Sequence, residues 1–190
     1  LSTLSEDGIA NLAPYSQWQN LTFDPPLVMF AANQLSSGKR KDTVINAEKT
    51  GWFVRNMATY DLREAVNISA MELDSSEDEF LHAGVSKQDC IDTKVPRVKE
   101  SPAHFECKYL STHRLAGNSN HGYVDVVYGE VIRIHVNDDF IDKTGKMDIS
   151  KIRPLARLGY YDYTSVKDVF EMRIPGASGK ASDGLEGKSS

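Results

Sequence analysis

Cysteine is scarce in this sequence, and its placement excludes several kinds of site. The chain has 190 residues but only 2 cysteines, Cys90 and Cys107, and neither belongs to a CxxC pair. The spacings of cysteine and histidine residues do not suggest a metal site. Zinc sites typically use pairs of cysteine or histidine ligands that are separated by a few residues, and several such pairs are needed. We therefore expect no metal site and a reducing, cytoplasmic location.

Long apolar runs and the glycine motifs of common nucleotide sites are also missing. No run approaches the roughly 20 residues that cross a bilayer, so we expect no membrane partner. Neither GxGxxG nor GxxxxGK[ST] occurs, which argues against a dinucleotide-binding parallel sheet and a P-loop. The 22 basic residues are outnumbered by 27 acidic ones, giving a net charge of -5, which argues against nucleic-acid binding. No catalytic constellation is apparent.

Strand patterns dominate what is present. Asp7-Gly8 supplies the positive φ of a tight turn and predicts a hairpin that pairs residues 1–4 with 9–16. Asp24-Pro25-Pro26 introduces a continuous apolar run, which is typical of a strand buried on both faces. In the strand that contains it, Gly129 marks a bulge or close approach. The further strands are expected at 27–32, 52–57, 103–113, 122–136 and 169–174.

Helix signals are fewer. Asp42 is expected to cap a helix over 43–50 that Gly51 ends, and Asp61 to cap a second helix over 62–71. The segment 74–101 is a long excursion with a short helix near Glu79, and Asp148 is expected to cap a short turn through 152. The chain is predicted to be mainly β with peripheral helices, in a small antiparallel β-barrel. We expect one domain over 1–175 and a disordered tail over 176–190.

Two nearby stretches have the chemistry of a nucleotide site. One, at 36–43, combines a flexible loop, three cations and hydroxyl donors at a helix start, which suits a phosphate monoester. The other, at 11–16, offers short side chains and one aromatic ring, against which a flat ring system could lie. On composition alone, three such cations more often belong to a solvated loop, and the helix start and the hydroxyl donors make the two interpretations about even.

The order of several short motifs resembles the flavin reductase-like, FMN-binding split-barrel proteins, which include flavoredoxin. The match runs from residue 1 to about 174. The matching motifs are Leu1 to Gly8, Asn11 to Ser16, Asp24-Pro25-Pro26, Lys41-Asp42-Thr43, Gly51 to Asn56, Glu100-Ser101-Pro102, Gly129-Glu130-Val131 and Arg153 to Gly159.

This resemblance implies a Greek-key split β-barrel that forms a homodimer, with two FMN sites along the interface. It also implies an earlier strand with an Arg-Pro pair, so the first strand is expected to be truncated here. The ring system would lie beside Ala13, Pro14, Tyr15 and Ser16, with Asn56 in reach. The ribityl chain and phosphate would lie along Ala31, Ala32, Asn33, Ser37, Lys39, Arg40, Lys41, Asp42 and Thr43. His121, Tyr160 and Tyr161 are candidates for substrate contact.

Three functions remain open at this point. The first is an FMN-dependent oxidoreductase that takes a hydride from NAD(P)H and passes electrons to an acceptor, which could be a partner protein. Such transfer depends on positioning, so it needs no catalytic acid or base from the protein. The second is a flavin-binding electron carrier or flavin store. The third is an interaction module with no ligand, using the acidic segment 74–79.

Overall fold

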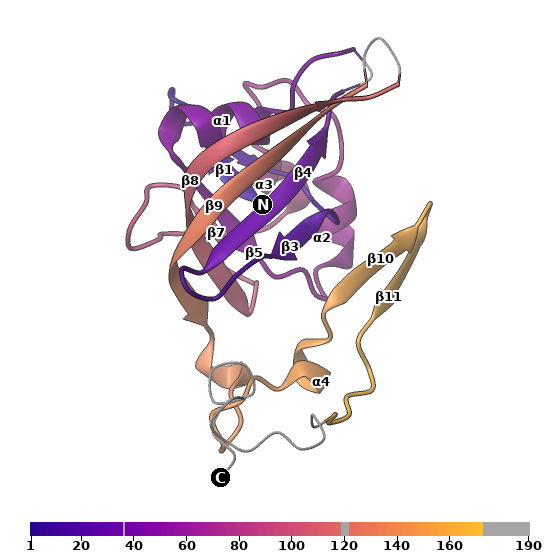
Figure 1. The fold of residues 1–190 in the computed structure, drawn as a ribbon. Coiled ribbons are helices and arrows are strands. Elements are labelled where there is room, and N and C mark those ends of the chain that lie inside the picture. The colour runs from indigo at the N-terminus through magenta and orange to yellow at the C-terminus, as the bar shows by residue number, and fades with distance from the viewer. Residues whose placement is uncertain (36, 119–121, 173–190) are drawn as a thin grey trace.

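A single antiparallel sheet organises the molecule (Figure 1). The computed structural model describes residues 1–35, 37–118 and 122–172. Seven strands pair in the order β2-β1-β5-β8-β9-β4-β3. Their bounds are β1 Ser2–Leu4, β2 Ala10–Leu12, β3 Trp18–Asn20, β4 Leu27–Asn33, β5 Trp52–Asn56, β8 Ala103–Ala116 and β9 Tyr123–Val136. This mainly β architecture, a split barrel with few helices, confirms the predicted fold class.

The split of the barrel lies between β2 and β3, which are the two edge strands of the sheet. These strands follow each other in the chain and are joined by residues 13–17. The amide of Ala13 donates to Leu1 O at 3.0 Å, and the carbonyl of Gln17 accepts from Ala31 N at 3.0 Å. The connection therefore spans the gap between the two sheet edges and is fixed at both of its ends.

The core fills the inside of the curled sheet. On β4, Val28, Phe30 and Ala32 are buried and alternate with half-buried residues, so the prediction of a strand buried on both faces is wrong. Phe30 packs edge-on against Phe53 of β5, with ring centroids 5.3 Å apart. A Cβ on Gly129 would lie 2.5 Å from the Phe53 ring. The predicted close approach at Gly129 is confirmed.

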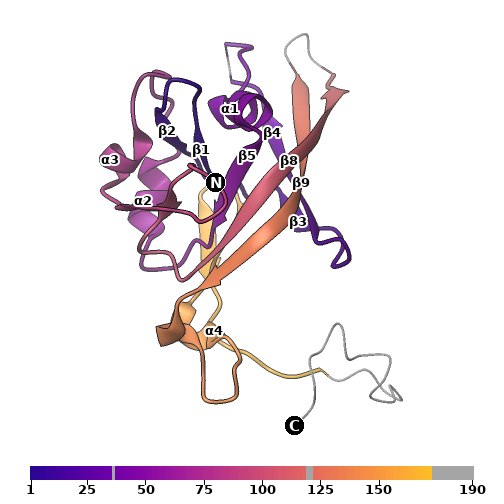
Figure 2. The same ribbon diagram turned by 90° about the vertical axis from the view of Figure 1, so that its left-hand side faces the viewer.

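The helices are short and lie around the sheet. Helix α1 spans Asp42–Thr50, α2 Arg63–Ile68, α3 Glu79–Ala83 and α4 Ile149–Ile152, and a 3-10 turn covers Asp138–Phe140. In Figure 2, α2 and α3 lie on the β1–β2 side, opposite the long β8–β9 ribbon. The Asp148 side chain caps α4 by accepting from Lys151 N, as expected. Of the described helices, none combines the length and apolarity needed to span a bilayer.

Two helix predictions need correction. No side chain caps α1, whose N-cap is Lys41, and Asp42 is already inside its first turn. The second helix starts at Arg63 after a turn in which Leu62 N bonds to Thr59 O, so Asp61 does not cap it. It ends at Ile68. Ser69 N still bonds four residues back, to Ala65 O, but the amides of Ala70 and Met71 bond three residues back.

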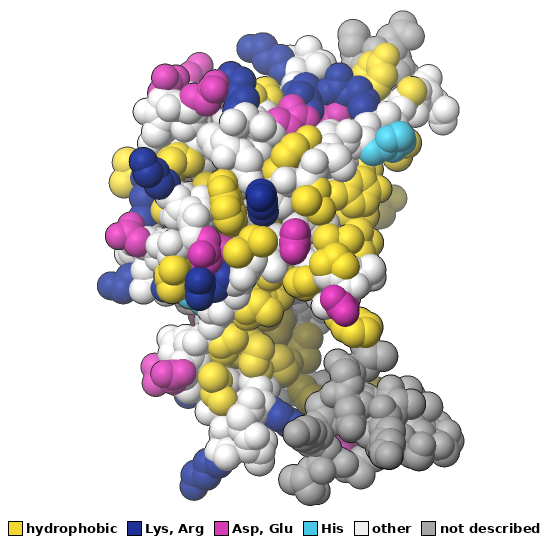
Figure 3. Space-filling view, turned by 60° about the vertical axis from the view of Figure 1, so that its left-hand side comes forward, with side chains coloured by type: hydrophobic (Ala, Val, Ile, Leu, Met, Phe, Trp, Pro, Cys, Tyr) yellow, Lys and Arg dark blue, Asp and Glu magenta, His cyan; other side chains and the backbone are white. Residues whose placement is uncertain are grey.

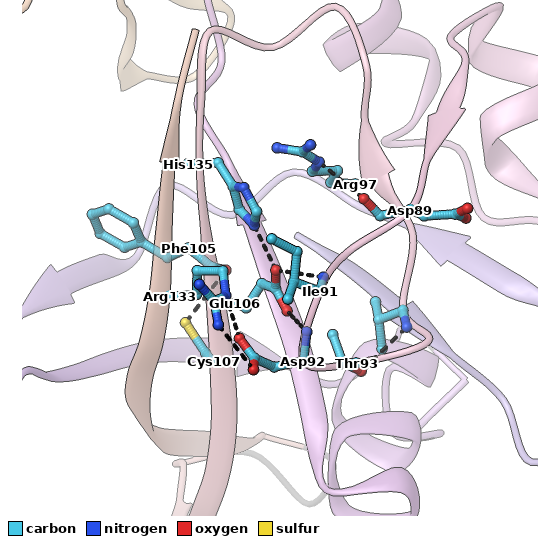
Figure 4. A network of polar contacts seen from close by, with 11 residues as sticks. Asp89, Ile91, Asp92, Thr93, Arg97, Phe105, Glu106, Cys107, Arg133 and His135 are labelled. Carbon is cyan, nitrogen blue, oxygen red and sulfur yellow. Dashed lines mark hydrogen bonds and ion pairs between the residues drawn. The ribbon is translucent and has the colours of Figure 1, made fainter.

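The excursion after α2 packs on the barrel. It holds α3 and the small strands β6 (Lys87–Gln88) and β7 (Arg97–Val98), which pair with each other. Figure 4 shows how Glu106 of β8 secures it: this fully buried carboxylate accepts from the amides of Ile91 at 2.9 Å and Asp92 at 2.8 Å. His135 of β9 contacts the same carboxylate at 2.5 Å. The excursion is thereby part of the folded domain.

A C-terminal arm stands beside the barrel in Figure 1. It is a hairpin of β10 (Leu155–Gly159) and β11 (Asp162–Ser165), which the sequence analysis did not predict. Its base is attached where Leu155 N bonds to Ala58 O at 3.0 Å. The strand expected at 169–174 does not form over 169–172. The rest of that strand and the expected tail at 176–190 lie outside the described residues.

Candidate functional site

A cleft of about 940 Å³ opens at the split of the barrel. The 13–17 connection and the ends of β4 and β5 line one side, α2 and the segment after it line another, and the arm lines a third. Twelve of the predicted site residues lie along it: Ala13, Pro14, Tyr15, Ser16, Ala31, Asn33, Lys41, Asp42, Thr43, Asn56, Tyr160 and Tyr161. The structure thus brings together residues from every part of the predicted site.

One end of the cleft is formed by the start of α1. Since no side chain caps this helix, its first amides are left to other partners, and Lys41 and Thr43 lie beside them. The carboxylate of Asp42 accepts from Ser75 Oγ at 3.0 Å and 3.1 Å. Lys41 Nζ lies 3.8 Å from Glu72. A cation and the positive end of a helix dipole therefore meet here, as an anionic group requires.

Arg40 was predicted to lie along the FMN phosphate, but in the structure it does not line the cleft and binds two carboxylates instead. Its guanidinium bonds to Glu48 at 2.6 Å and 2.8 Å and to Asp125 at 2.8 Å. Arg114 also binds Asp125, at 2.8 Å and 3.0 Å. Burial favours the protonated form of Asp125, but hydrogen bonds from both arginines hold its pKa below the usual range. Arg40 thereby fixes the loop to the sheet.

Three other predicted residues also lie away from the cleft lining. Ala32 is buried in the core, and neither Ser37 nor Lys39 is among the lining residues. Ser37 Oγ accepts from Lys39 N at 3.4 Å, a contact within the loop. His121 lies outside the described residues.

The hydroxyl of Tyr15 is buried and has no hydrogen-bond partner among the described residues. Its ring packs edge-on against Phe30, with centroids 5.0 Å apart. Burial raises the pKa of Tyr15 to about 12. The Thr43 hydroxyl instead donates to Asn11 Oδ1 at 2.8 Å. A buried hydroxyl without a partner is costly, so this wall of the cleft is one where a polar ligand atom would be stabilised.

Beneath that wall lies a buried polar network that the sequence analysis missed. Asn11 Nδ2 donates to Glu79 at 2.7 Å, and Leu12 N donates to the same carboxylate at 3.2 Å. Burial raises the pKa of Glu79. Glu79 lines the cleft and comes from the excursion, more than 65 residues away in the chain. The sequence analysis predicted the short helix that carries Glu79 but not this role; in the structure Asp78 caps the helix by accepting from Phe80 N.

Asn56 lines the cleft, but its amide holds strands together. Its Oδ1 accepts from Val98 N at 2.8 Å, and its Nδ2 donates to Ser2 Oγ at 3.1 Å. Ser2 in turn donates to Pro96 O at 2.6 Å. Asn56 therefore links β5, β1 and the excursion at the edge of the site, and both ends of its amide are already hydrogen-bonded.

The arm brings two adjacent tyrosines to the mouth of the cleft. Tyr160 and Tyr161 are 91% and 95% exposed. Tyr160 has a positive φ of 47°, which is uncommon for a residue with a side chain. The Arg157 guanidinium donates to Tyr160 O at 3.1 Å and supports this turn. Two exposed aromatic rings at a strained turn are typical of a ligand-contacting position.

Comparison with known proteins agrees with this architecture. The family model of the flavin reductase like domain matches residues 1–164. A protein of Aquifex aeolicus (strain VF5) is 33% identical over 166 residues, which cover 85% of this chain and 80% of the relative. Such a match over most of both chains indicates common ancestry and a shared fold.

Solved structures extend the likeness. Nitrilotriacetate monooxygenase component B from Bacillus cereus is 29% identical, with a TM-score of 0.82 over 90% of this chain and 84% of that one. A protein with a split barrel domain from Shewanella frigidimarina shares the fold at 24% identity, with a TM-score of 0.78 over 91% and 83%. An FMN-binding domain from Shewanella baltica does so at 17%, with 0.69 over 90% and 87%. The chain therefore belongs to the flavin reductase-like family of split-barrel proteins.

Proposed function

We propose that this protein is an FMN-binding oxidoreductase of the flavin reductase type, which moves a hydride from NAD(P)H to flavin and electrons on to an acceptor. The proposal rests on one arrangement: a cleft at the split of the barrel, with Lys41 and an uncapped helix start at one end. Family membership and the FMN-binding domain from Shewanella baltica support the same ligand.

The lining residues fit FMN. Its phosphate would be held by Lys41 and the first amides of α1, since these combine charge with backbone donors. Ala13 and Pro14 present short side chains against which the ring system would lie. The buried hydroxyl of Tyr15 lacks a partner that a polar atom of the ligand would supply. The cleft volume of about 940 Å³ is within the about 300–1,000 Å³ of ligand sites.

When bound, FMN supplies the hydride and electron chemistry that no amino-acid side chain offers. The contribution of the chain is to bind and orient the reactants, because hydride transfer depends on alignment and distance. Lys41 would exchange its contact with Glu72 for the ligand phosphate. Tyr160 and Tyr161 would cover the mouth of the cleft and exclude water from it.

The quaternary structure is part of the proposal. Several apolar side chains are exposed on the β8–β9 ribbon, among them Ile132 at 42% and Ile134 at 59%. Figure 3 shows hydrophobic side chains in a band along this side of the molecule. Exposed apolar surface of this kind marks interaction sites, which suits a homodimer. An acceptor protein and a cytoplasmic location complete the proposal.

The experiment is an absorption titration of the full chain. Added FMN should bind and stay with the protein through gel filtration, and NADH or NADPH should bleach the bound flavin under anaerobic conditions. Protein that takes up no FMN contradicts the proposal as a whole. Flavin that binds but is reduced only by dithionite or a protein donor would establish the carrier or store instead. Light scattering on the same samples tests the dimer.

A further inference from the structure

Arg55 is a cation of the cleft that the family-derived site does not include. It lies on β5 and is half-buried, and its side chain lines the cleft together with Trp18. Its guanidinium carbon lies 5.7 Å from the centre of the Trp18 ring and 5.1 Å from that of Phe105. Two aromatic rings therefore hold the planar group in place by cation–π contact.

Within the described part of the chain, Arg55 differs from every other arginine. Arg40, Arg114 and Arg133 bind carboxylates, Arg153 lies 4.0 Å from Asp61, and Arg63, Arg97 and Arg157 bind backbone carbonyl oxygens. Arg55 alone has neither an ion pair nor a hydrogen bond to oxygen. Burial lowers the pKa of its guanidinium. An arginine remains charged under these conditions, so an unpaired cation is kept inside the cleft.

An unpaired, half-buried charge is unfavourable for the folded protein unless a ligand pairs with it. A guanidinium in cation–π contact with rings still has N–H donors to offer, and these match a carboxylate with two parallel hydrogen bonds. Other aromatic side chains line the same cleft: besides Trp18, the arm contributes Tyr160, Tyr161 and Tyr163. Charge and walls together favour a flat ring that carries one carboxylate.

We infer that Arg55 is the anchor of a second subsite in the cleft, which binds the carboxylate of an aromatic acid. This inference rests on the proposed function, since the acid would be the acceptor held beside the flavin. The cleft volume of about 940 Å³ is near the upper limit of the about 300–1,000 Å³ seen for ligand sites. It therefore has room for a small planar acid as well as the cofactor.

The probe for the test is benzoate. The chain has 2 tryptophans, so a Trp52→Phe background leaves Trp18, beside Arg55, as the fluorescent reporter in FMN-free protein. Benzoate should change this fluorescence in a saturable way, and acetate and benzyl alcohol, which each lack one half of the ligand, should bind more weakly. In FMN-loaded protein, benzoate should perturb the flavin absorption spectrum with a similar affinity.

Substitution separates the contributions of charge and shape. Arg55→Met keeps the aliphatic stem between the rings and should weaken benzoate at least tenfold, about 1.4 kcal/mol. Arg55→Lys, which keeps the charge but loses the planar fork, should fall in between. Arg63→Met, a change at an exposed arginine outside the cleft lining, is the matched control and should bind benzoate as the parent does. FMN affinity of Arg55→Met should stay within threefold.

Each outcome decides between alternatives. Equal benzoate affinity in Arg55→Met and the parent, or no saturable response at all, overturns the subsite. If saturating FMN displaces benzoate and Arg55→Met loses FMN affinity to the same degree, Arg55 belongs to the flavin site and the inference is wrong. If benzoate binds through Arg55 but FMN does not bind, the anion subsite stands and the proposed function fails.

Discussion

Arg40 and Arg55 belong to two regions that flank the same site, and their surroundings are opposite. Arg40 lies between two carboxylates in a network that includes the buried Asp125. Arg55 lies between two aromatic rings and has no acid within reach among the described residues. The charge of Arg40 is neutralised by carboxylates that hold the fold together, whereas the charge of Arg55 is available to a ligand. Sequence position does not distinguish them, because only tertiary contacts decide whether a charge is already neutralised.

The largest loss of stability is expected from removing the carboxylate that Arg40 shares with Arg114. Asp125→Ala leaves Arg40 and Arg114 without their shared acid and should lower the free energy of unfolding by about 3 kcal/mol. Urea denaturation measures the change. Glu6→Gln, which removes the exposed partner of Lys49, is the control and should leave the midpoint unchanged. If Asp125→Ala lowers the free energy of unfolding no more than this control does, the Arg40–Asp125–Arg114 network does not stabilise the fold.

Glu106 gives the next largest effect and a dependence on pH. Glu106→Gln should cost about 2 kcal/mol at pH 7, because a neutral amide replaces the carboxylate that accepts from two backbone amides and contacts His135. Although burial opposes ionisation, these hydrogen bonds hold the pKa of Glu106 below its ordinary value.

The sign of the pH effect follows from that lowered pKa. The stabilisation is complete above the unfolded pKa of about 4.3, and it is lost as the pH falls through the lower folded value. Urea melts between pH 5 and pH 3 should show the wild-type protein losing stability faster than Glu106→Gln. Parallel curves for the two proteins would show that Glu106 has no such role.

Lys41 and Lys39 test the phosphate end of the cleft. Lys41→Gln should weaken FMN binding about tenfold, or 1.4 kcal/mol, since Lys41 lies at the uncapped start of α1. Lys39→Gln, in the same loop but outside the cleft lining, should change it by less than threefold. FMN fluorescence titration measures both constants. If Lys39→Gln weakens FMN binding more than Lys41→Gln does, Lys39 and not Lys41 contacts the phosphate.

The smallest change in stability is expected at Arg55, which has no carboxylate partner among the described residues. Arg55→Met should leave the free energy of unfolding unchanged within about 0.5 kcal/mol or raise it slightly, because an unpaired charge leaves a partly buried position. Thermal and urea melts of the ligand-free protein give the value. A loss above about 2 kcal/mol would mean that Arg55 supports the fold and has no charge available for a ligand.

Local signals in the sequence predicted much of the fold. The turn at Asp7-Gly8 and the close approach at Gly129 follow from backbone geometry, and the structure confirms them. The apolar run after Pro26 predicted a strand correctly, but that strand is buried on one face and not on both. The β10–β11 hairpin was missed although Tyr163 and Thr164 favour strands. Strands β10 and β11 are short and form a separate two-stranded sheet, so the sequence contains no extended strand pattern that would have predicted them.

The site was predicted less completely. Motif order selected Lys41 and Thr43, which line the cleft in the structure, since the loop and the helix that carry them are adjacent in the chain. It could not separate Arg40 from Lys41, because the acids that bind Arg40 come from α1 and β9. Glu79 and Arg55 escaped notice for a similar reason: their surroundings are assembled from segments far apart in sequence.

The connection of residues 13–17 has a mechanical consequence. Five residues extend at most about 17 Å, and hydrogen bonds secure both ends of this tether to the rims it joins. The width of the aperture is therefore set by the length of the tether, whatever molecule enters. Lengthening it by a residue or two would be the direct way to make the opening admit a bulkier guest, with the sheet itself left intact.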